Sequence, residues 1–149
     1  MNIVIRAASY KDSDVLTAIS FAAKRHWNYP DEYFDVWKDE LTITPSYIQK
    51  HIVYVAERSG QAVGYFSLVE VKTDFRAGKI LINKGTWLEH IFILPEYIGK
   101  GIGTQLIDFM KIKCKEMNIG TIHIFSDCIR IYNFSGDCKQ LITCSLAEK

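Results

Sequence analysis

The spacing of apolar residues changes along this chain, and each change predicts a different kind of element. Near the N-terminus a short apolar run is followed by polar residues suited to cap a helix, and then by Leu16, Ile19 and Ala23 at helical spacing. Aromatic residues at the same spacing predict a second helix, and a Thr-Pro pair opens a third helical turn. The predicted elements are a strand at 3–5, a helix after the capping run 11–14, a helix at 31–41 and a helical turn at 44–49.

From residue 52 onward the pattern is that of extended chain. Two runs rich in β-branched and aromatic residues, 52–57 and 62–71, are separated by four residues that include Gly60. A short connection of this kind predicts an antiparallel hairpin. The polar stretch 72–85 is broken by glycines and is predicted as a loop, with the apolar triplet 80–82 inside it as a strand extension or an apolar contact.

The next segments predict a crossover of strand, helix and strand. An apolar run at 87–94 is stopped by Pro95, a helical pattern follows at 104–117, and a β-rich run occupies 121–126. Such a crossover nearly always places its two strands parallel in one sheet. With the earlier hairpin and a last strand at about 139–144, the order predicts an α+β fold: a mixed, mostly antiparallel central sheet with one parallel β-α-β crossover, flanked by helices.

Composition limits the classes of function. The 149 residues, 48% of them apolar and 23% charged, predict a single domain over residues 1–149. A net charge of +1 favours neither nucleic acid nor an anionic membrane as a partner. The four cysteines lack zinc-ligand spacing, so we expect no metal and reduced thiols. Without a signal core or a long apolar run, the expectation is a soluble, cytoplasmic protein.

Three alternating glycines stand between the strand at 87–94 and the helix that follows it. Gly99, Gly101 and Gly103 let the backbone approach another molecule closely, because they lack Cβ atoms. They also lie where the helix starts, and the free N–H groups of a helix N-terminus attract anions, phosphates above all. The sequence therefore predicts a phosphate-binding turn, with the ligand at the carboxyl ends of the parallel strands.

Several phosphate-binding motifs share this layout. A P-loop requires Lys followed by Ser or Thr, whereas Lys100 is followed by Gly101, so a P-loop is excluded. A dinucleotide fingerprint requires G-x-G-x-x-G, whereas this chain has G-x-G-x-G late in its length. Binding of a nicotinamide dinucleotide is kept as an alternative, supported only by Asp127 after the next strand.

The stretch resembles the acetyl-coenzyme A motif of the GNAT acetyltransferase superfamily, Arg/Gln-x-x-Gly-x-Gly/Ala after a strand that ends in an apolar-x-Pro sequence. It departs from that motif at its first position, where Ile98 stands for Arg or Gln. The resemblance implies acetyl-coenzyme A as co-substrate, with its diphosphate on the backbone amides of the turn and Lys100 as a nearby charge. The implied cofactor-binding residues are Phe92, Ile93, Ile98, Gly99, Lys100, Gly101, Ile102, Gly103 and Thr104.

The resemblance extends to the order of elements over most of the chain and to the tail. In the family, a Phe/Tyr-Tyr-x-x-x-Gly pattern carries a tyrosine that protonates the leaving thiolate, and Tyr132 with Gly136 keeps that spacing. Tyr132 is therefore the candidate acid, with core packing as the alternative. The family also implies an oxyanion site at the amides near Phe92 and Ile93. Few residues follow Gly136, so an edge strand is missing; we expect a homodimer to cover it, with a truncated or altered C-terminus as the alternative.

The candidate base lies on the strand before the turn. Glu89 and His90 point to opposite faces of that strand. Glu89 shares its face with Ile91 and Ile93, so it is either partly buried with a raised pKa, as a base requires, or paired with a residue such as Arg25. His90 and water are the alternatives. A loop cluster at 26–29, comprising His26, Trp27 and Tyr29, is placed to line a substrate opening.

Two functions from different classes follow. The first is an N-acetyltransferase that passes acetyl from acetyl-coenzyme A directly to a primary amine in a ternary complex. The second is a coenzyme A-binding sensor or assembly module of the same fold with little or no catalysis. The acceptor of the first is a small-molecule or peptide amine, and the sequence does not choose among a polyamine, an aminoglycoside, an amino acid and a protein amine.

Overall fold

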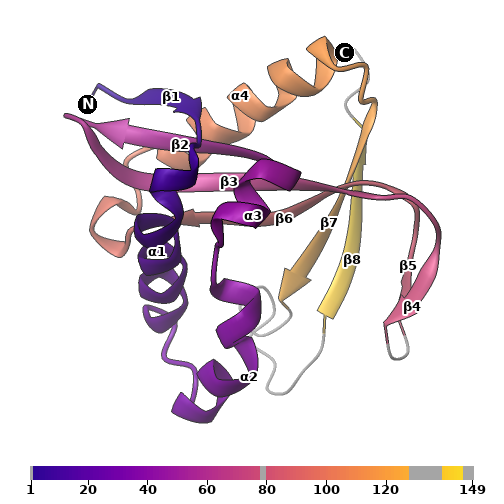
Figure 1. Ribbon diagram of the computed structural model, residues 1–149, viewed down its shortest axis with the longest axis horizontal. Coiled ribbons are helices and arrows are strands. Elements are labelled where there is room, and N and C mark those ends of the chain that lie inside the picture. The colour runs from indigo at the N-terminus through magenta and orange to yellow at the C-terminus, as the bar shows by residue number, and fades with distance from the viewer. Residues whose placement is uncertain (1, 78–79, 128–138, 146–149) are drawn as a thin grey trace. The chain divides into compact units, whose positions relative to one another are not determined.

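The computed structural model describes residues 2–77, 80–127 and 139–145 (Figure 1). The chain forms two compact units, Met1–Ser67 with His90–Phe109 and Leu68–Glu89 with Met110–Lys149. The elements in chain order are β1 (Val4–Ala7), the 3-10 turn η1 (Tyr10–Asp12), α1 (Ser13–Arg25), α2 (Asp31–Leu41), α3 (Pro45–Lys50), β2 (Ile52–Arg58), β3 (Gln61–Val71), β4 (Phe75–Ala77), β5 (Ile80–Ile82), β6 (Gly85–Ile93), the 3-10 turn η2 (Pro95–Tyr97), α4 (Ile102–Glu116), β7 (Thr121–Asp127) and β8 (Lys139–Ser145).

Hydrogen bonding joins the strands in the order β1-β2-β3-β6-β7-β8, with β4 and β5 as a separate pair. β1 is antiparallel to β2, and β7 is antiparallel to β8. β6 and β7 are parallel, with pairs that run from Thr86 opposite Ile122 to Leu88 opposite Ile124. The predicted fold class, a mixed and mostly antiparallel sheet with one parallel crossover, is therefore confirmed. The prediction of a single domain over 1–149 stays a prediction.

In the first unit, α1 and α3 cover one face of β2 and β3. Thr44 caps α3 by accepting a hydrogen bond from the Tyr47 amide at 3.0 Å, and Pro45 occupies the first turn, where its missing N–H does no harm. The apolar side chains that meet on this face come from both helices, both strands and the connection between α2 and α3. They are Leu16, Ile19, Ile43, Ile48, Val53, Val55 and Tyr65.

The opposite face of the same strands packs against α4. Tyr54 and Phe66 stack with their ring centres 5.6 Å apart, and Phe109 of α4 lies 4.9 Å from Tyr54. Successive residues of a strand point to opposite faces. Tyr54 therefore contacts α4, whereas its sequence neighbours Val53 and Val55 face α1 and α3. This packing fixes the start of α4, and with it the glycine turn, to the strands of the first unit.

The second unit contains the clearest error of the sequence prediction. Residues 72–85, predicted as a loop, hold β4 and β5, which pair antiparallel from Phe75 opposite Ile82 to Ala77 opposite Ile80 (Figure 1). The strands are only three residues each, too short for a periodic pattern, and polar residues and Gly78 hid them. Of the two alternatives for residues 80–82, a strand extension or an apolar contact, the structure agrees with the strand.

Other boundaries agree with the sequence to within a few residues. The helix predicted at 31–41 is α2 at the same bounds, whereas β1 and α4 are shifted by one or two residues. Asn118 ends α4 with φ of +60°, the left-handed conformation that closes many helices. The segment that carries Tyr132 lies outside the described residues.

Candidate functional site

The glycine turn joins β6 to α4 through η2. Gly99 and Gly101 have φ values of +81° and +82°, which L side chains rarely adopt. A Cβ atom built on either glycine has no atom within 4 Å, so the backbone faces open space. α4 begins at Ile102, and the first N–H groups of a helix have no partner within it. Backbone donors and the positive end of the helix dipole thus meet beside that space, which fits an anionic group such as a diphosphate.

Neighbouring side chains hold the turn in place. Ile102 is 1% exposed, so of this predicted cofactor-binding residue only the backbone is available to a ligand. A Cβ on Gly103 would lie 3.3 Å from Cδ1 of Ile93, which keeps the first turn of α4 close to the end of β6. Ile98, in contrast, is 46% exposed. The turn is therefore anchored on one side and open on the other.

The end of β6 packs closely on β3. A Cβ on Gly64 would lie 2.9 Å from the carbonyl oxygen of Phe92, too close for any other residue at position 64 without a shift of the backbone. Just beyond, the Leu94 amide donates to the Val63 carbonyl at 2.9 Å. The predicted oxyanion residues Phe92 and Ile93 thus belong to a rigid strand end.

His90 is a buried neutral imidazole. It is 4% exposed and lies among aromatic rings, with the Phe92 ring centre 5.6 Å away and that of Tyr47 6.1 Å away. Burial lowers the pKa of His90 to about 4, although the charge and a main-chain hydrogen bond of Glu40 oppose the shift; Lys24 adds to it. His90 is thus uncharged at neutral pH and has little basicity.

Glu89 is exposed, unlike its neighbours Leu88 and His90. The partial burial that the sequence suggested for a basic carboxylate is therefore absent. The pattern of β6 misled here because Ile91 and Ile93, on the same face as Glu89, are themselves only half-buried. The role of Glu89 as base stays a prediction.

The residues of the loop cluster expected at a substrate opening differ in their exposure to solvent. Tyr29 is 7% exposed and packs edge-on against Trp37, with ring centres 4.8 Å apart. The Lys24 ammonium lies 4.5 Å from the centre of the Trp37 ring, a cation–π contact that the sequence did not suggest. Trp27 is 45% exposed. Only the exposed part of the cluster is available to a substrate.

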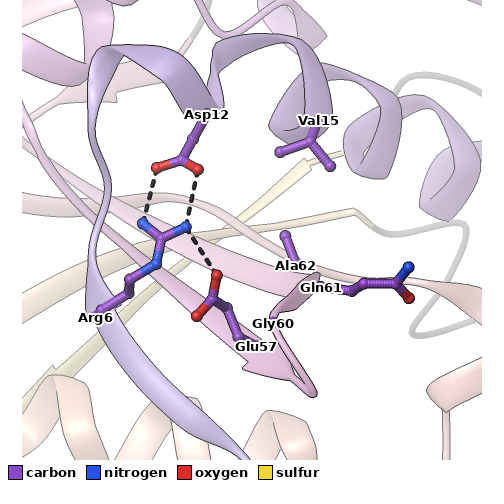
Figure 2. A pocket seen from close by; sticks show the side chains of 7 residues that line it. All are labelled: Arg6, Asp12, Val15, Glu57, Gly60, Gln61 and Ala62. Carbon is purple, nitrogen blue, oxygen red and sulfur yellow. Dashed lines mark hydrogen bonds and ion pairs between the residues drawn. The ribbon is translucent and has the colours of Figure 1, made fainter.

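A second polar site in the first unit had no signal in the sequence motifs. Arg6 donates to both carboxylate oxygens of Asp12 at 2.9 Å and to Glu57 at 3.0 Å, as Figure 2 shows. These contacts lower the pKa of Asp12, chiefly through the hydrogen bonds from Arg6. The site borders a cavity of about 350 Å³ lined by Arg6, Asp12, Val15, Glu57, Gly60, Gln61 and Ala62.

One further contact near the glycine turn escaped the sequence prediction. The Arg58 guanidinium carbon lies 5.8 Å from the centre of the Tyr97 ring, within the range of a cation–π interaction. The two residues are far apart in sequence, and only the pairing of β3 with the end of β6 would have brought them together.

A metal site and a membrane-spanning helix are both absent from the described residues. Within residues 2–77, 80–127 and 139–145, no group of three His, Cys, Asp or Glu side chains is arranged to hold a metal ion. No helix in that same part of the chain has the length and hydrophobicity needed to cross a membrane.

Comparison with known proteins gives a consistent picture. The sequence model of the acetyltransferase (GNAT) family matches residues 16–133, whereas a search of curated proteins found no significant match. PaiA N-acetyltransferase from Thermoplasma acidophilum, solved with coenzyme A, is 18% identical, with a TM-score of 0.74 over 97% of this chain and 99% of that chain. A GNAT acetyltransferase from Brucella melitensis, solved with acetyl-CoA, is 22% identical, with a TM-score of 0.59 over 95% and 87%.

Proposed function

Because the chain belongs to the GNAT acetyltransferase family, we propose that it transfers an acetyl group from acetyl-coenzyme A to a primary amine by direct attack in a ternary complex. The observation that carries the proposal is the glycine turn. Its two left-handed glycines, the open space beside them and the start of α4 form a cradle of backbone donors. The two structural relatives named above hold coenzyme A or acetyl-CoA.

In this proposal the backbone from Ile98 to Thr104 binds the diphosphate, with Lys100 close by. The helix dipole of α4 adds to the attraction. Amides at Phe92 and Ile93 stabilise the oxyanion that forms when the amine adds to the thioester carbonyl. Their place on a closely packed strand end favours this role, because an oxyanion site works only when its donors are already in position.

The reaction requires two proton transfers. The amine nitrogen attacks the thioester carbon, the C–S bond breaks, and the departing thiolate takes a proton from the Tyr132 hydroxyl. Glu89 or a water molecule takes the proton from the amine nitrogen. The buried His90, with a pKa of about 4, is poorly suited to that task at neutral pH. Glu89 at least has access to solvent.

A binding and turnover experiment tests the proposal. Thermal shift with acetyl-coenzyme A, ATP and a nicotinamide dinucleotide should give a rise only with the first, because a ligand stabilises the state that binds it. A panel of amines, chosen as polyamine, aminoglycoside, amino acid and peptide, should then reveal turnover. A shift with the dinucleotide alone would contradict acetyl-coenzyme A binding. Tight binding without any turnover would favour the sensor or assembly module.

Two variants separate binding from chemistry. Tyr132→Phe keeps the ring but removes the hydroxyl, so coenzyme A affinity should persist while kcat falls by about a hundredfold. Glu89→Gln should lower kcat/KM and remove the acidic limb of its pH profile. Tyr10→Phe, at an exposed position on η1, is the control and should change neither quantity. Unchanged rates in both test variants would mean that neither residue transfers a proton.

A further inference from the structure

Arg58 ends β2 at the point where two turns of the first unit run side by side. The hydrogen bond from the Leu94 amide to the Val63 carbonyl holds β3 against the end of β6. Beyond this bond the chain on one side forms the turn between β2 and β3, and on the other side it forms η2 and then the glycine turn. The contact of Arg58 with Tyr97 joins these two turns.

The kind of contact matters for what Arg58 can do. A cation–π contact is electrostatic and uses no hydrogen bond, so Tyr97 can hold the Arg58 guanidinium without engaging its N–H donors. Arg6 is the contrast in the same unit, because its N–H groups are directed at Asp12 and Glu57. The Arg58 side chain is exposed, and the residue that it contacts, Tyr97, directly precedes Ile98 of the turn.

The glycine turn itself has no net charge to offer an anionic ligand. Between Leu94 and Thr104 the sequence contains one cation, Lys100, and one anion, Glu96, which cancel. Ile98 is apolar and exposed. A ligand that carries several phosphate charges would gain from a cation of another segment, and the contact with Tyr97 brings Arg58 close to the turn.

We propose that Arg58, positioned by Tyr97, is a phosphate-binding residue of the coenzyme A site. This inference rests on the proposed function. Arg58 would supply charge-assisted hydrogen bonds to a phosphate of the coenzyme, beside the backbone donors of the turn. The fork of a guanidinium suits a phosphate better than a lysine does, because it presents paired donors in one plane.

Isothermal titration of the full chain with coenzyme A tests the role of Arg58 without any need for turnover. Arg58→Gln should weaken binding about tenfold, the usual scale for one charge-assisted hydrogen-bonding group. It should also make the affinity less sensitive to salt, because one cation fewer meets the phosphates. Lys11→Gln is the matched control: Lys11 lies 6.0 Å from the Tyr10 ring centre, in the same kind of surface contact, and its loss should change neither quantity.

Two further measurements sharpen the result. Ile98→Arg places a guanidinium on the turn itself and should restore most of the affinity that Arg58→Gln loses. Dephospho-coenzyme A, which lacks the 3′-phosphate, identifies the phosphate involved: an unchanged tenfold loss in Arg58→Gln assigns the diphosphate, and a vanished loss assigns the 3′-phosphate.

The outcomes separate this inference from the proposed function. If the wild-type chain does not bind coenzyme A, the proposed function itself fails. If the wild type binds and Arg58→Gln binds within about twofold of it with the same salt dependence, only the role of Arg58 is overturned. Equal losses in Arg58→Gln and Lys11→Gln would also overturn it, because they would reflect net charge alone.

Discussion

The Arg6 cluster and the glycine turn lie in the same compact unit, and they treat their polar groups in opposite ways. Asp12 and Glu57 both accept hydrogen bonds from Arg6, and Asp12 also accepts one from the Ser9 amide at 2.7 Å. In the turn, by contrast, two left-handed glycines face open space just before the start of α4. The charged groups beside Arg6 are thus paired within the chain, whereas the turn leaves an open space that the proposed coenzyme would fill.

The contrast shows why a charged cavity is a poor guide to function by itself. Buried or half-buried charges in proteins are usually paired, and pairing that is complete within the chain indicates a structural role. His90 belongs with the Arg6 cluster in this respect, since it is buried, neutral and in contact with the Glu40 main chain. Substitutions should therefore affect ligand binding at the turn and stability at the other two places.

The largest expected effect is on the turn. Gly101→Val adds a branched side chain at φ of +82° and fills the space that a diphosphate would occupy. Coenzyme A binding, measured by titration, should weaken by at least about a thousandfold, to below detection. The strained backbone should also cost about 1–3 kcal/mol of stability.

Gly120→Val is the control for this variant. Gly120 also has no atom within 4 Å of an added Cβ, but its φ is not left-handed. Coenzyme A affinity should remain that of the wild type. If Gly101→Val binds coenzyme A normally while it stays folded, the turn is not the diphosphate site, and it no longer differs from the Arg6 cluster as a place for ligand binding.

The next effect concerns stability as a function of pH. His90 has a folded pKa of about 4, below the ordinary value of 6.5, so the unfolded chain takes up the proton first as the pH falls. Between pH 6.5 and 4 this linkage should remove about 3 kcal/mol of stability, and above pH 6.5 it should remove none. Denaturant unfolding at several pH values should give a flatter profile for His90→Gln.

The control is His26→Gln, at an exposed histidine. It measures how far the loss of a surface histidine alone changes the slope between pH 6.5 and 4, and His90→Gln should flatten that slope more. An identical slope in His90→Gln would show that His90 titrates normally, which its burial and ring contacts oppose.

The sequence predicted the fold and the turn far better than it predicted the chemistry around them. Strong local signals explain the success: Pro95 ends β6, glycines mark the turn, and a helical period marks α4. Contacts between distant segments explain the failures. The exposure of Glu89 and the contact of Arg58 with Tyr97 depend on which strands become neighbours, and a local pattern does not encode that pairing.

The same limit applies to the Arg6 cluster. Arg6 and Glu57 are 51 positions apart and meet only because β1 pairs with β2, which places Arg6 two residues along β1 from Val4, the residue opposite Glu57. The hairpin of β4 and β5 was missed for a different reason, because strands of three residues show no period. The roles of Tyr132 and Glu89 stay predictions.

The smallest expected effect is on stability and concerns the Arg6 cluster, whose charged groups are paired within the chain. Asp12→Ala removes the acceptor of Arg6 and of the Ser9 amide, and it should lower the free energy of unfolding by about 1–3 kcal/mol. Coenzyme A affinity should not change. Glu116→Gln breaks the exposed pair with Lys113 and, as a control, should cost less than about 0.5 kcal/mol.

The pH dependence of the stability lost in Asp12→Ala shows whether Asp12 acts through its ion pair with Arg6 or through packing. The folded pKa of Asp12 lies below its ordinary value, so the stability that Asp12 contributes is present above pH 3.8 and is lost as the pH falls through the lower, folded pKa. Wild type and Asp12→Ala should therefore converge in stability at strongly acidic pH. A difference that stays constant down to that pH would assign the role of Asp12 to packing, and the Arg6 cluster would no longer be a site held together by its charges.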